Sequence, residues 1–312
     1  MFGPGSNPAK AFPRVPGRVR SHRLGNYLKT AVLMAGLTAL FLAVGDKLGG
    51  PQGMLWAGTF VVGLNFITYW FSDRIALALN RAVPLEPGQL PWLHDTVARL
   101  AHRAGMPTPR LFLIPTPAPN AFATGRNPGH AAVAVTEGIL HVLDRRELTG
   151  VLAHELSHIK NRDTLISTIA ATLAGIITQV ARLAFWFGGS FFGGGRDRDE
   201  EGHGSVLGSL GMLIVAPIAA MLLQLAISRS REYGADATGA ALSDDPNALA
   251  DALQKLERGA EAIPYDQAPA TAPLFIVNPL TGGGLMRLFS THPSTEERVK
   301  RLRELAHGGL IR

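Results

Sequence analysis

Four long apolar runs place the strongest constraint on how this chain of 312 residues can fold. They cover residues 30–45, 54–71, 164–187 and 206–227. A helix needs roughly 20 residues to cross a hydrocarbon core, so the third and fourth runs are long enough and the first two are marginal. We therefore predict a mainly α-helical integral membrane protein with about four transmembrane helices. Buried core helices are the alternative for all four runs, and a signal peptide is a further alternative for the first.

The charges that flank these runs predict their orientation. Six lysines and arginines, and no acidic residue, precede the first run, which places residues 1–29 in the cytoplasm. The Gly-rich, net acidic segment 188–205 is then an external loop, and Arg229 and Arg231 return the chain to the cytoplasm. A nucleic-acid arm is the alternative for the basic leader, but a basic flank before a membrane span fits better. We expect a lipid bilayer as partner and no nucleic acid.

A short motif between the second and third runs indicates metal chemistry. The chain has no cysteine, so a metal must be held by His, Asp or Glu. His154 and His158 are four residues apart, and such positions on a helix share a face with Cβ atoms about 5–6 Å apart. Both imidazoles can then reach one zinc ion, with Glu155 as general base for water. The alternative is a chance match on a helix with two surface histidines.

The residues around this motif predict a helix. Asp144 and Glu147 have the spacing of a capping box. Residues 91–104 and 245–258 also have helical periodicity, and Ser294 with Glu297 predicts a last helix that runs to about residue 306. The apolar stripe of the motif helix consists of Leu148, Val151, Leu152, Leu156 and Ile159.

A small sheet is expected in the same soluble part. Residues 110–114 and 132–136 are short runs typical of strands, and residues 120–125 have the composition of one arm of a hairpin. An extended arm near a catalytic helix is a place where substrate can add as a strand. The predicted substrate-binding residues are Asn120, Ala121, Phe122, Ala123 and Thr124. An ordinary hairpin is the alternative.

A catalytic zinc usually has three protein ligands and one open position. Glu232 is our candidate for the third, because it follows the fourth apolar run in sequence compatible with a helix. Asp236, one turn later, can orient a ligand histidine. A juxtamembrane Arg–Glu pair is the alternative for residues 231–232. By composition alone, the competing ligands are His141, Glu257 and His292.

These features divide the chain into five parts. Residues 1–29 form a basic cytoplasmic tail, and residues 30–71 form a transmembrane hairpin. Residues 72–163 form a cytoplasmic catalytic part with the His-Glu-x-x-His helix. Residues 164–227 form a second transmembrane pair, and residues 228–312 form a cytoplasmic part that supplies the third ligand.

Several motifs together resemble the HtpX family of membrane-bound zinc metalloproteases, which is related to the CAAX prenyl proteases. The likeness covers roughly residues 24–306 and leaves out the Pro/Gly/Arg-rich tail. It is carried by Asn-Ala-Phe-Ala-Thr-Gly at 120–125, Val-Thr-Glu-Gly at 135–138, His-Glu-Leu-Ser-His at 154–158 with Asn-Arg-Asp at 161–163, Arg-Glu-Tyr-Gly-Ala-Asp at 231–236, and Ser-Thr-His-Pro at 290–293 with Glu-Arg at 297–298.

The resemblance implies a zincin-like α+β domain and a role for each matched residue. One Zn²⁺ per chain would be held by His154, His158 and Glu232, with Asp236 behind a ligand histidine. Glu155 would be the general base, and His292 and Arg298 would lie near the scissile carbonyl. By spacing alone, those last two are a loop histidine and a helix arginine.

The expected function is hydrolysis of peptide bonds in unfolded or cytoplasm-exposed segments of proteins, in quality control under stress. Misfolded membrane proteins are the expected substrates, and the expected location is a bacterial inner membrane with both termini cytoplasmic. One alternative is a prenyl-protein processing protease. The other is a non-catalytic membrane scaffold or transporter stabilised by zinc, against which Glu155 argues because a structural site needs no general base. Self-association of copies stays open.

Overall fold

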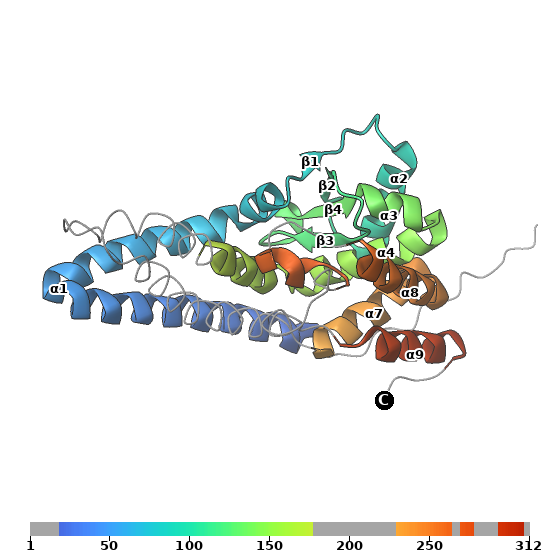
Figure 1. Cartoon of the computed structure of the whole chain (residues 1–312). Helices are drawn as coiled ribbons and strands as arrows, with labels where there is room; N and C mark the ends of the chain where they lie inside the picture. Colours follow the sequence, from blue (N-terminus) through green and yellow to red (C-terminus); the bar gives the residue numbers. More distant parts are fainter. Residues whose placement is uncertain (1–18, 177–228, 264–268, 278–292, 309–312) are drawn as a thin grey trace, which may run out of the picture.

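The computed structural model describes residues 19–176, 229–263, 269–277 and 293–308, and shows a helical hairpin attached to an α+β domain (Figure 1). The basic tail before residue 19, the predicted external loop 188–205 and the whole fourth apolar run lie outside these residues. The third run is described only as the helix Thr164–Ile176. The second predicted transmembrane pair therefore stays a prediction.

The hairpin is α1 (Val19–Leu79), which consists of two helices joined at a sharp break. Gly49 and Gly50 leave the helical conformation there, and Gly50 has a φ of 57°, which glycine adopts without steric cost. The helices Gly25–Lys47 and Gly49–Leu79 have 23 and 31 residues. At about 1.5 Å per residue they are roughly 35 and 47 Å long, so both can cross a bilayer. They are longer than predicted because each continues past its apolar run.

Most of the apolar surface of this hairpin is exposed. Only 24% of the most apolar window in the first helix, and 11% of that in the second, is buried. A core helix of a soluble protein would be mostly buried, so this exposure favours contact with lipid. The exposed large side chains include Val32, Leu40, Leu55, Trp56, Phe60, Val62, Phe66 and Trp70.

The domain contains a four-stranded sheet in the order β1 (Val83–Pro84), β2 (Arg110–Ile114), β4 (Ala132–Thr136) and β3 (Ala121–Thr124). β2 and β4 are parallel, whereas β1 pairs antiparallel with β2 and β3 pairs antiparallel with β4. The three predicted strands are confirmed. The sequence did not predict β1, because two residues that include a proline carry no strand pattern.

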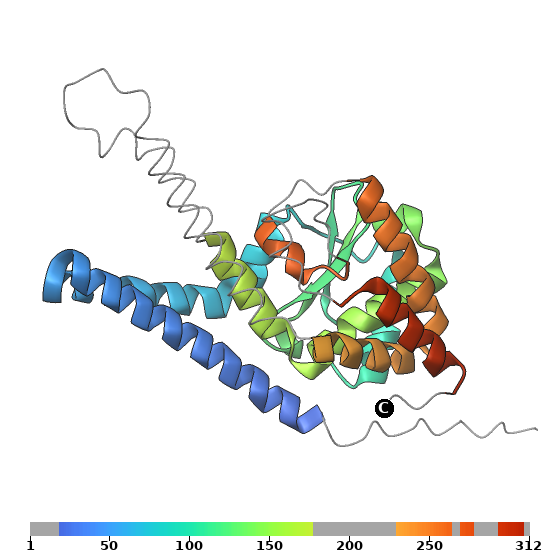
Figure 2. The ribbon, with the colours of Figure 1, turned by 60° about the horizontal axis from the view of Figure 1, so that its bottom comes forward.

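This sheet separates two apolar clusters. Side chains that alternate along β4 contribute to both clusters. Val133 and Val135 join the cluster that contains α2 (Pro91–Ala104), α4 (Arg145–Asn161) and α8 (Pro246–Ala262). Ala132 and Ala134 join a second cluster, together with the hairpin and the Thr164–Ile176 helix. The membrane hairpin is therefore packed into the same sheet as the soluble helices, and both views show it projecting from one side of the domain (Figure 2).

The predicted helices of the domain are confirmed, and their ends follow local chemistry. At the start of α4, Asp144 Oδ1 accepts from Glu147 N at 2.8 Å, and Glu147 Oε2 accepts from Asp144 N at 3.0 Å. The five residues of the predicted apolar stripe of α4 are buried. The remaining elements are α3 (Glu137–Val142), α7 (Arg229–Ser243) and α9 (Thr295–Ala306), with short 3-10 turns η1 (Pro128–His130) and η2 (Pro269–Leu274).

Candidate active site

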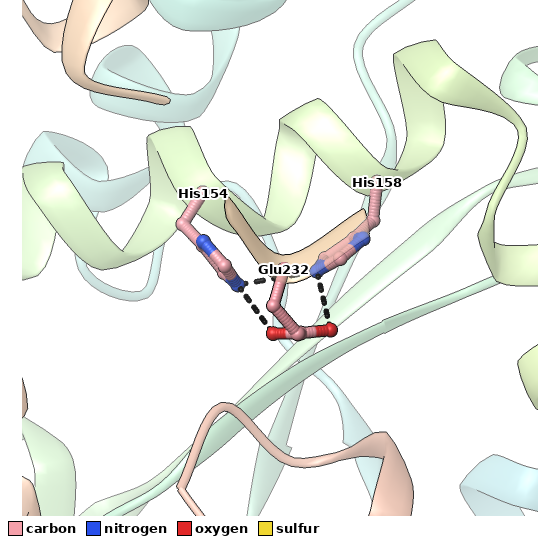
Figure 3. A group of neighbouring side chains, drawn as sticks. All are labelled: His154, His158 and Glu232. Atoms are coloured by element: carbon pink, nitrogen blue, oxygen red, sulfur yellow. Dashed lines mark hydrogen bonds and ion pairs between the residues drawn. The ribbon is translucent and has the colours of Figure 1, made fainter. Parts of the chain in front are cut away.

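α4 presents His154 and His158 on the same face, one turn apart, as Figure 3 shows. Their Nε2 atoms lie 3.1 Å apart. His154 is buried and His158 is partly exposed toward a cavity. The helical spacing of four residues is therefore sufficient to bring both imidazole nitrogens to one point.

Glu232 on α7 places its carboxylate between the two imidazoles (Figure 3). Its Oε1 lies 3.6 Å from His158 Nε2, and its Oε2 lies 3.7 Å from His154 Nε2. Two donors each bound at about 2.0–2.1 Å to a tetrahedral zinc ion would lie roughly 3.3–3.4 Å apart. The three residues, whose ligand atoms all lie within 4.8 Å of one another, therefore fit such an ion with small adjustments.

The competing third ligands are not part of this group. His141 on α3 and Glu257 on α8 are both exposed at the surface. His292 lies outside the described residues, so its predicted place near a scissile carbonyl stays a prediction. Among the residues that the structure describes, Glu232 is the carboxylate that joins the two histidines.

A carboxylate stands behind each histidine and bonds its Nδ1 atom. Asp236 Oδ1 lies 2.9 Å from His154 Nδ1, and Asp163 Oδ2 lies 3.2 Å from His158 Nδ1. A proton held on each Nδ1 leaves each Nε2 lone pair free to bind a metal. Burial lowers the pKa of His154 to about 4. Burial also disfavours the charged form of His158, but Glu232 and Asp163 outweigh it and raise its pKa to about 9.

Asp163 belongs to the Asn-Arg-Asp motif at 161–163, but the sequence alone predicts no role for it in the metal site. α4 ends at Asn161 and is capped by Arg162, whose φ of 65° turns the chain back on itself. Asp163 N then donates to His158 O at 2.9 Å, which brings the Asp163 side chain beside the imidazole ring of His158. The Asn-Arg-Asp sequence at the end of the helix is the available signal, since a carboxylate just past a helix end can fold back on the last turn.

Arg298 on α9 is fully buried and holds Asp236 from behind. Its Nε and Nη2 atoms donate to the two Asp236 carboxylate oxygens at 2.9 and 2.7 Å, and its Nη1 donates to Ile276 O at 3.0 Å. Burial disfavours ionisation of Asp236, but the charge of Arg298 and the hydrogen bonds outweigh it and lower the pKa to about 2. The predicted role of Arg298 near the scissile carbonyl stays a prediction, while its observed partners favour orientation of Asp236.

Glu155 lines the same cavity as the three metal-ligand candidates. The cavity measures about 30 Å³, which suits an ion with a water molecule but not a peptide. Burial raises the pKa of Glu155 to about 8, against the opposing effects of His158 and of the Ala123 N–H that donates to it. Part of the cavity wall comes from the end of η2 and the residues that follow it, at Leu274, Phe275 and Ile276.

The predicted substrate strand is β3, the edge strand next to α4. Thr136 N bonds Asn120 O, so the alternation of an antiparallel ladder turns the backbone groups of Ala121 and Ala123 away from β4. The chain itself covers part of this edge: Ile276 N donates to Ala121 O at 3.1 Å, and Asn120 Nδ2 donates to Val277 O at 2.8 Å. The outward edge at Ala123, beside Glu155, borders the cavity.

The chain is similar to known proteins over most of its length. Residues 87–306 match the model of a family described as Peptidase family M48. A Protease HtpX homolog of Desulforapulum autotrophicum is 54% identical over 92% of this chain and 92% of that protein. A Protease HtpX homolog of Persephonella marina is 54% identical over 89% of this chain and 97% of that protein. The crystal structure of S. mikatae Ste24p covers 91% of this chain and 67% of its own, with 21% identity and a TM-score of 0.45.

Proposed function

Because this chain belongs to peptidase family M48 and is a membrane metalloprotease, we propose that it is a zinc-dependent endopeptidase with one Zn²⁺ per chain. The observation that carries the proposal is the shared cavity of Glu155, His154, His158 and Glu232. Three ligands and a carboxylate that is not a ligand match an open catalytic site, whereas a structural zinc site is closed by four ligands. This argues against the non-catalytic scaffold, and the HtpX relatives do not favour the prenyl-processing alternative.

In this site the chain's own residues bind the metal and move the proton. A bound zinc ion would polarise the scissile carbonyl and lower the pKa of a water molecule beside it. Glu155 takes the proton of the attacking water and delivers it to the leaving amine. A divalent cation held by these ligands would favour the ionised form of Glu155, against the burial that raises its pKa. Asp163 and Asp236 hold the two imidazoles in orientation.

The substrates that suit this site are extended protein segments. We propose that a substrate N–H donates to the carbonyl oxygen of Ala123 on the outward edge of β3, next to Glu155, because the edge at Ala121 already bonds Ile276 and the Ala123 N–H donates to Glu155. Folded helices have no free backbone donors for such pairing, so unfolded segments are preferred. We also propose that the enzyme is a multi-pass protein of a bacterial inner membrane with both termini in the cytoplasm. Because its domain packs on the membrane hairpin, the proposed targets are cytoplasm-exposed parts of misfolded membrane proteins.

Casein cleavage by the purified, zinc-loaded protein tests the activity, with Glu155→Gln as the control. The glutamine keeps the side-chain volume and can still accept the hydrogen bond from Ala123 N, so the fold should be retained. Cleavage by the wild type that the variant lacks supports the proposal. Equal cleavage by both proteins would assign the activity to a contaminant or to another site.

Backbone methylation of the substrate tests the pairing with β3 without changing the enzyme. A series of peptides, each N-methylated at one amide around the scissile bond, should show raised KM at the amide that pairs with Ala123 and not at the amides directly before and after it. This pattern follows because alternate amides of a paired strand point toward its neighbour. A variant such as Ala123→Pro is a poorer test, because the same N–H donates to Glu155. Equal tolerance of methylation at all positions would exclude strand pairing.

A further inference from the structure

Asn26 lies at the start of the first membrane helix, Gly25–Lys47, and is buried. Its surroundings differ from those of most of that helix, which is exposed. Its Nδ2 donates to Asp163 Oδ1 at 2.7 Å, and its Oδ1 accepts from Arg231 Nη1 at 3.2 Å. One side-chain amide therefore joins segments that are separated by 137 and 205 residues in the sequence.

Each partner of Asn26 either contacts a metal-ligand candidate or is its neighbour in the sequence. The other oxygen of Asp163, Oδ2, contacts Nδ1 of His158. Arg231 immediately precedes Glu232 on α7, and its side chain lines the same cavity. The amide can satisfy both partners in only one orientation, because the carboxylate needs a donor and the guanidinium needs an acceptor. Asn26 thereby fixes the carboxylate behind one ligand and the helix turn that carries another.

We propose that Asn26 is a positioning residue of the metal centre, so that the first membrane helix completes the active site. This inference rests on the proposed metal centre of His154, His158 and Glu232. Asp163 bonded to Asn26 has one oxygen held, which leaves the other aimed at the His158 ring. Groups that orient metal ligands typically contribute about 10–100-fold to metal affinity. Displacement of the first helix relative to the domain would therefore lower the affinity of the site for the metal.

A matched control exists in the same hairpin. Asn65 Nδ2 donates to Thr38 Oγ1 at 2.9 Å, so its side-chain amide ties the two hairpin helices to each other, whereas that of Asn26 ties the hairpin to the domain. Neither residue lines the cavity. A general loss of hairpin packing should therefore be seen equally with Asn65→Ala, whereas an effect on the metal should be specific to Asn26.

The test measures zinc affinity of the full-length, detergent-purified protein by competition with a chromophoric chelator, and records the visible absorption of the Co²⁺-substituted form. Asn26→Ala should weaken zinc binding about 10–100-fold and alter the Co²⁺ spectrum, while Asn65→Ala should leave both unchanged. Asn26→Asp keeps the shape and an acceptor for Arg231 but places a second carboxylate beside Asp163, so it should weaken zinc binding even where the fold is retained.

Two results would overturn the inference. If Asn26→Asp and Asn26→Ala bind zinc with wild-type affinity while Glu232→Ala does not, Asn26 has only a structural role and the metal centre stands. If Glu232→Ala itself retains stoichiometric zinc, the proposed metal centre is wrong and the inference falls with it. The Glu232→Ala arm therefore separates failure of this proposal from failure of the proposed function.

Discussion

Gly239 on α7 lies against the backbone of His154 on α4, with no room for a side chain between them. A Cβ atom at position 239 would lie 2.9 Å from both Cα and N of His154. This close approach sets the separation of the two helices that supply the metal ligands. Glu232 is seven residues before Gly239 on the same helix, so its reach toward the histidines depends on this contact.

Gly239→Ala should therefore push α7 away from α4 and weaken zinc binding. Overpacking of this kind typically costs about 1–3 kcal/mol, and the displaced Glu232 should reduce zinc affinity by roughly tenfold or more. Gly234→Ala is the control, because a Cβ placed there would have no atom within 4 Å apart from the adjoining backbone of its own helix. Alanine is the better helix former, so that variant should be as stable as the wild type or more so. Thermal melts and chelator competition on both proteins measure the difference.

Glu155→Gln should abolish peptide cleavage and leave the zinc content near that of the wild type. The loss follows because glutamine cannot accept a proton, and a general base contributes about 10²–10⁴-fold. The zinc is retained because the three ligand candidates are unchanged. Metal analysis of the dialysed protein, alongside a peptide assay, makes the comparison. Activity within about tenfold of the wild type would refute the general-base assignment.

Glu232→Ala should lose zinc to a mild chelator that does not strip the wild type. Two histidines on one helix remain, but the link between α4 and α7 is removed, and metal binding no longer contributes to packing of the two helices. Limited proteolysis should then show greater cleavage within residues 229–245. If the zinc-free wild type shows the same pattern as the variant, the increase is due to the missing metal rather than to the alanine.

Arg298→Lys should lower stability and zinc affinity more than the catalytic rate of the zinc-loaded enzyme. Lysine keeps the charge but lacks the planar fork that bonds both Asp236 oxygens and Ile276 O. The buried groups left without a donor cost on the order of 1–3 kcal/mol. Asp236 would then hold His154 less firmly. A large fall in kcat at saturating zinc, with unchanged zinc affinity, would instead support the donor role near the scissile carbonyl.

Cysteine labelling tests the proposed topology, and the absence of native cysteine removes any background. Cysteines at Ser6 and Asp95 should resist membrane-impermeant thiol reagents in intact cells, while one at Ser205 should label. Asp95 is exposed on α2, so its protection would come from the membrane and not from burial. Permeabilised cells provide the control for reactivity. Labelling at Asp95 in intact cells would place the active site on the outer side.

The sequence by itself determined the features that depend on a few neighbouring residues. The capping box at Asp144 and the pairing of His154 with His158 follow from helical geometry, because every contact lies within about two turns. The three longer strands were predicted from short apolar runs between turn residues. In each case, the signal and the structure it predicts occupy the same segment.

Only the tertiary structure decided what meets at the metal centre. From local sequence patterns, His141, Glu257 and His292 are candidates for the third ligand as well as Glu232, and no role is predicted for Asn26. The close packing of α7 on α4 at Gly239 brings Glu232 to the histidines, and Asn26 reaches Asp163 because the membrane hairpin shares a core with the sheet. These contacts join segments tens to hundreds of residues apart, and their geometry is set by side-chain packing between helices, which no periodicity within one segment encodes.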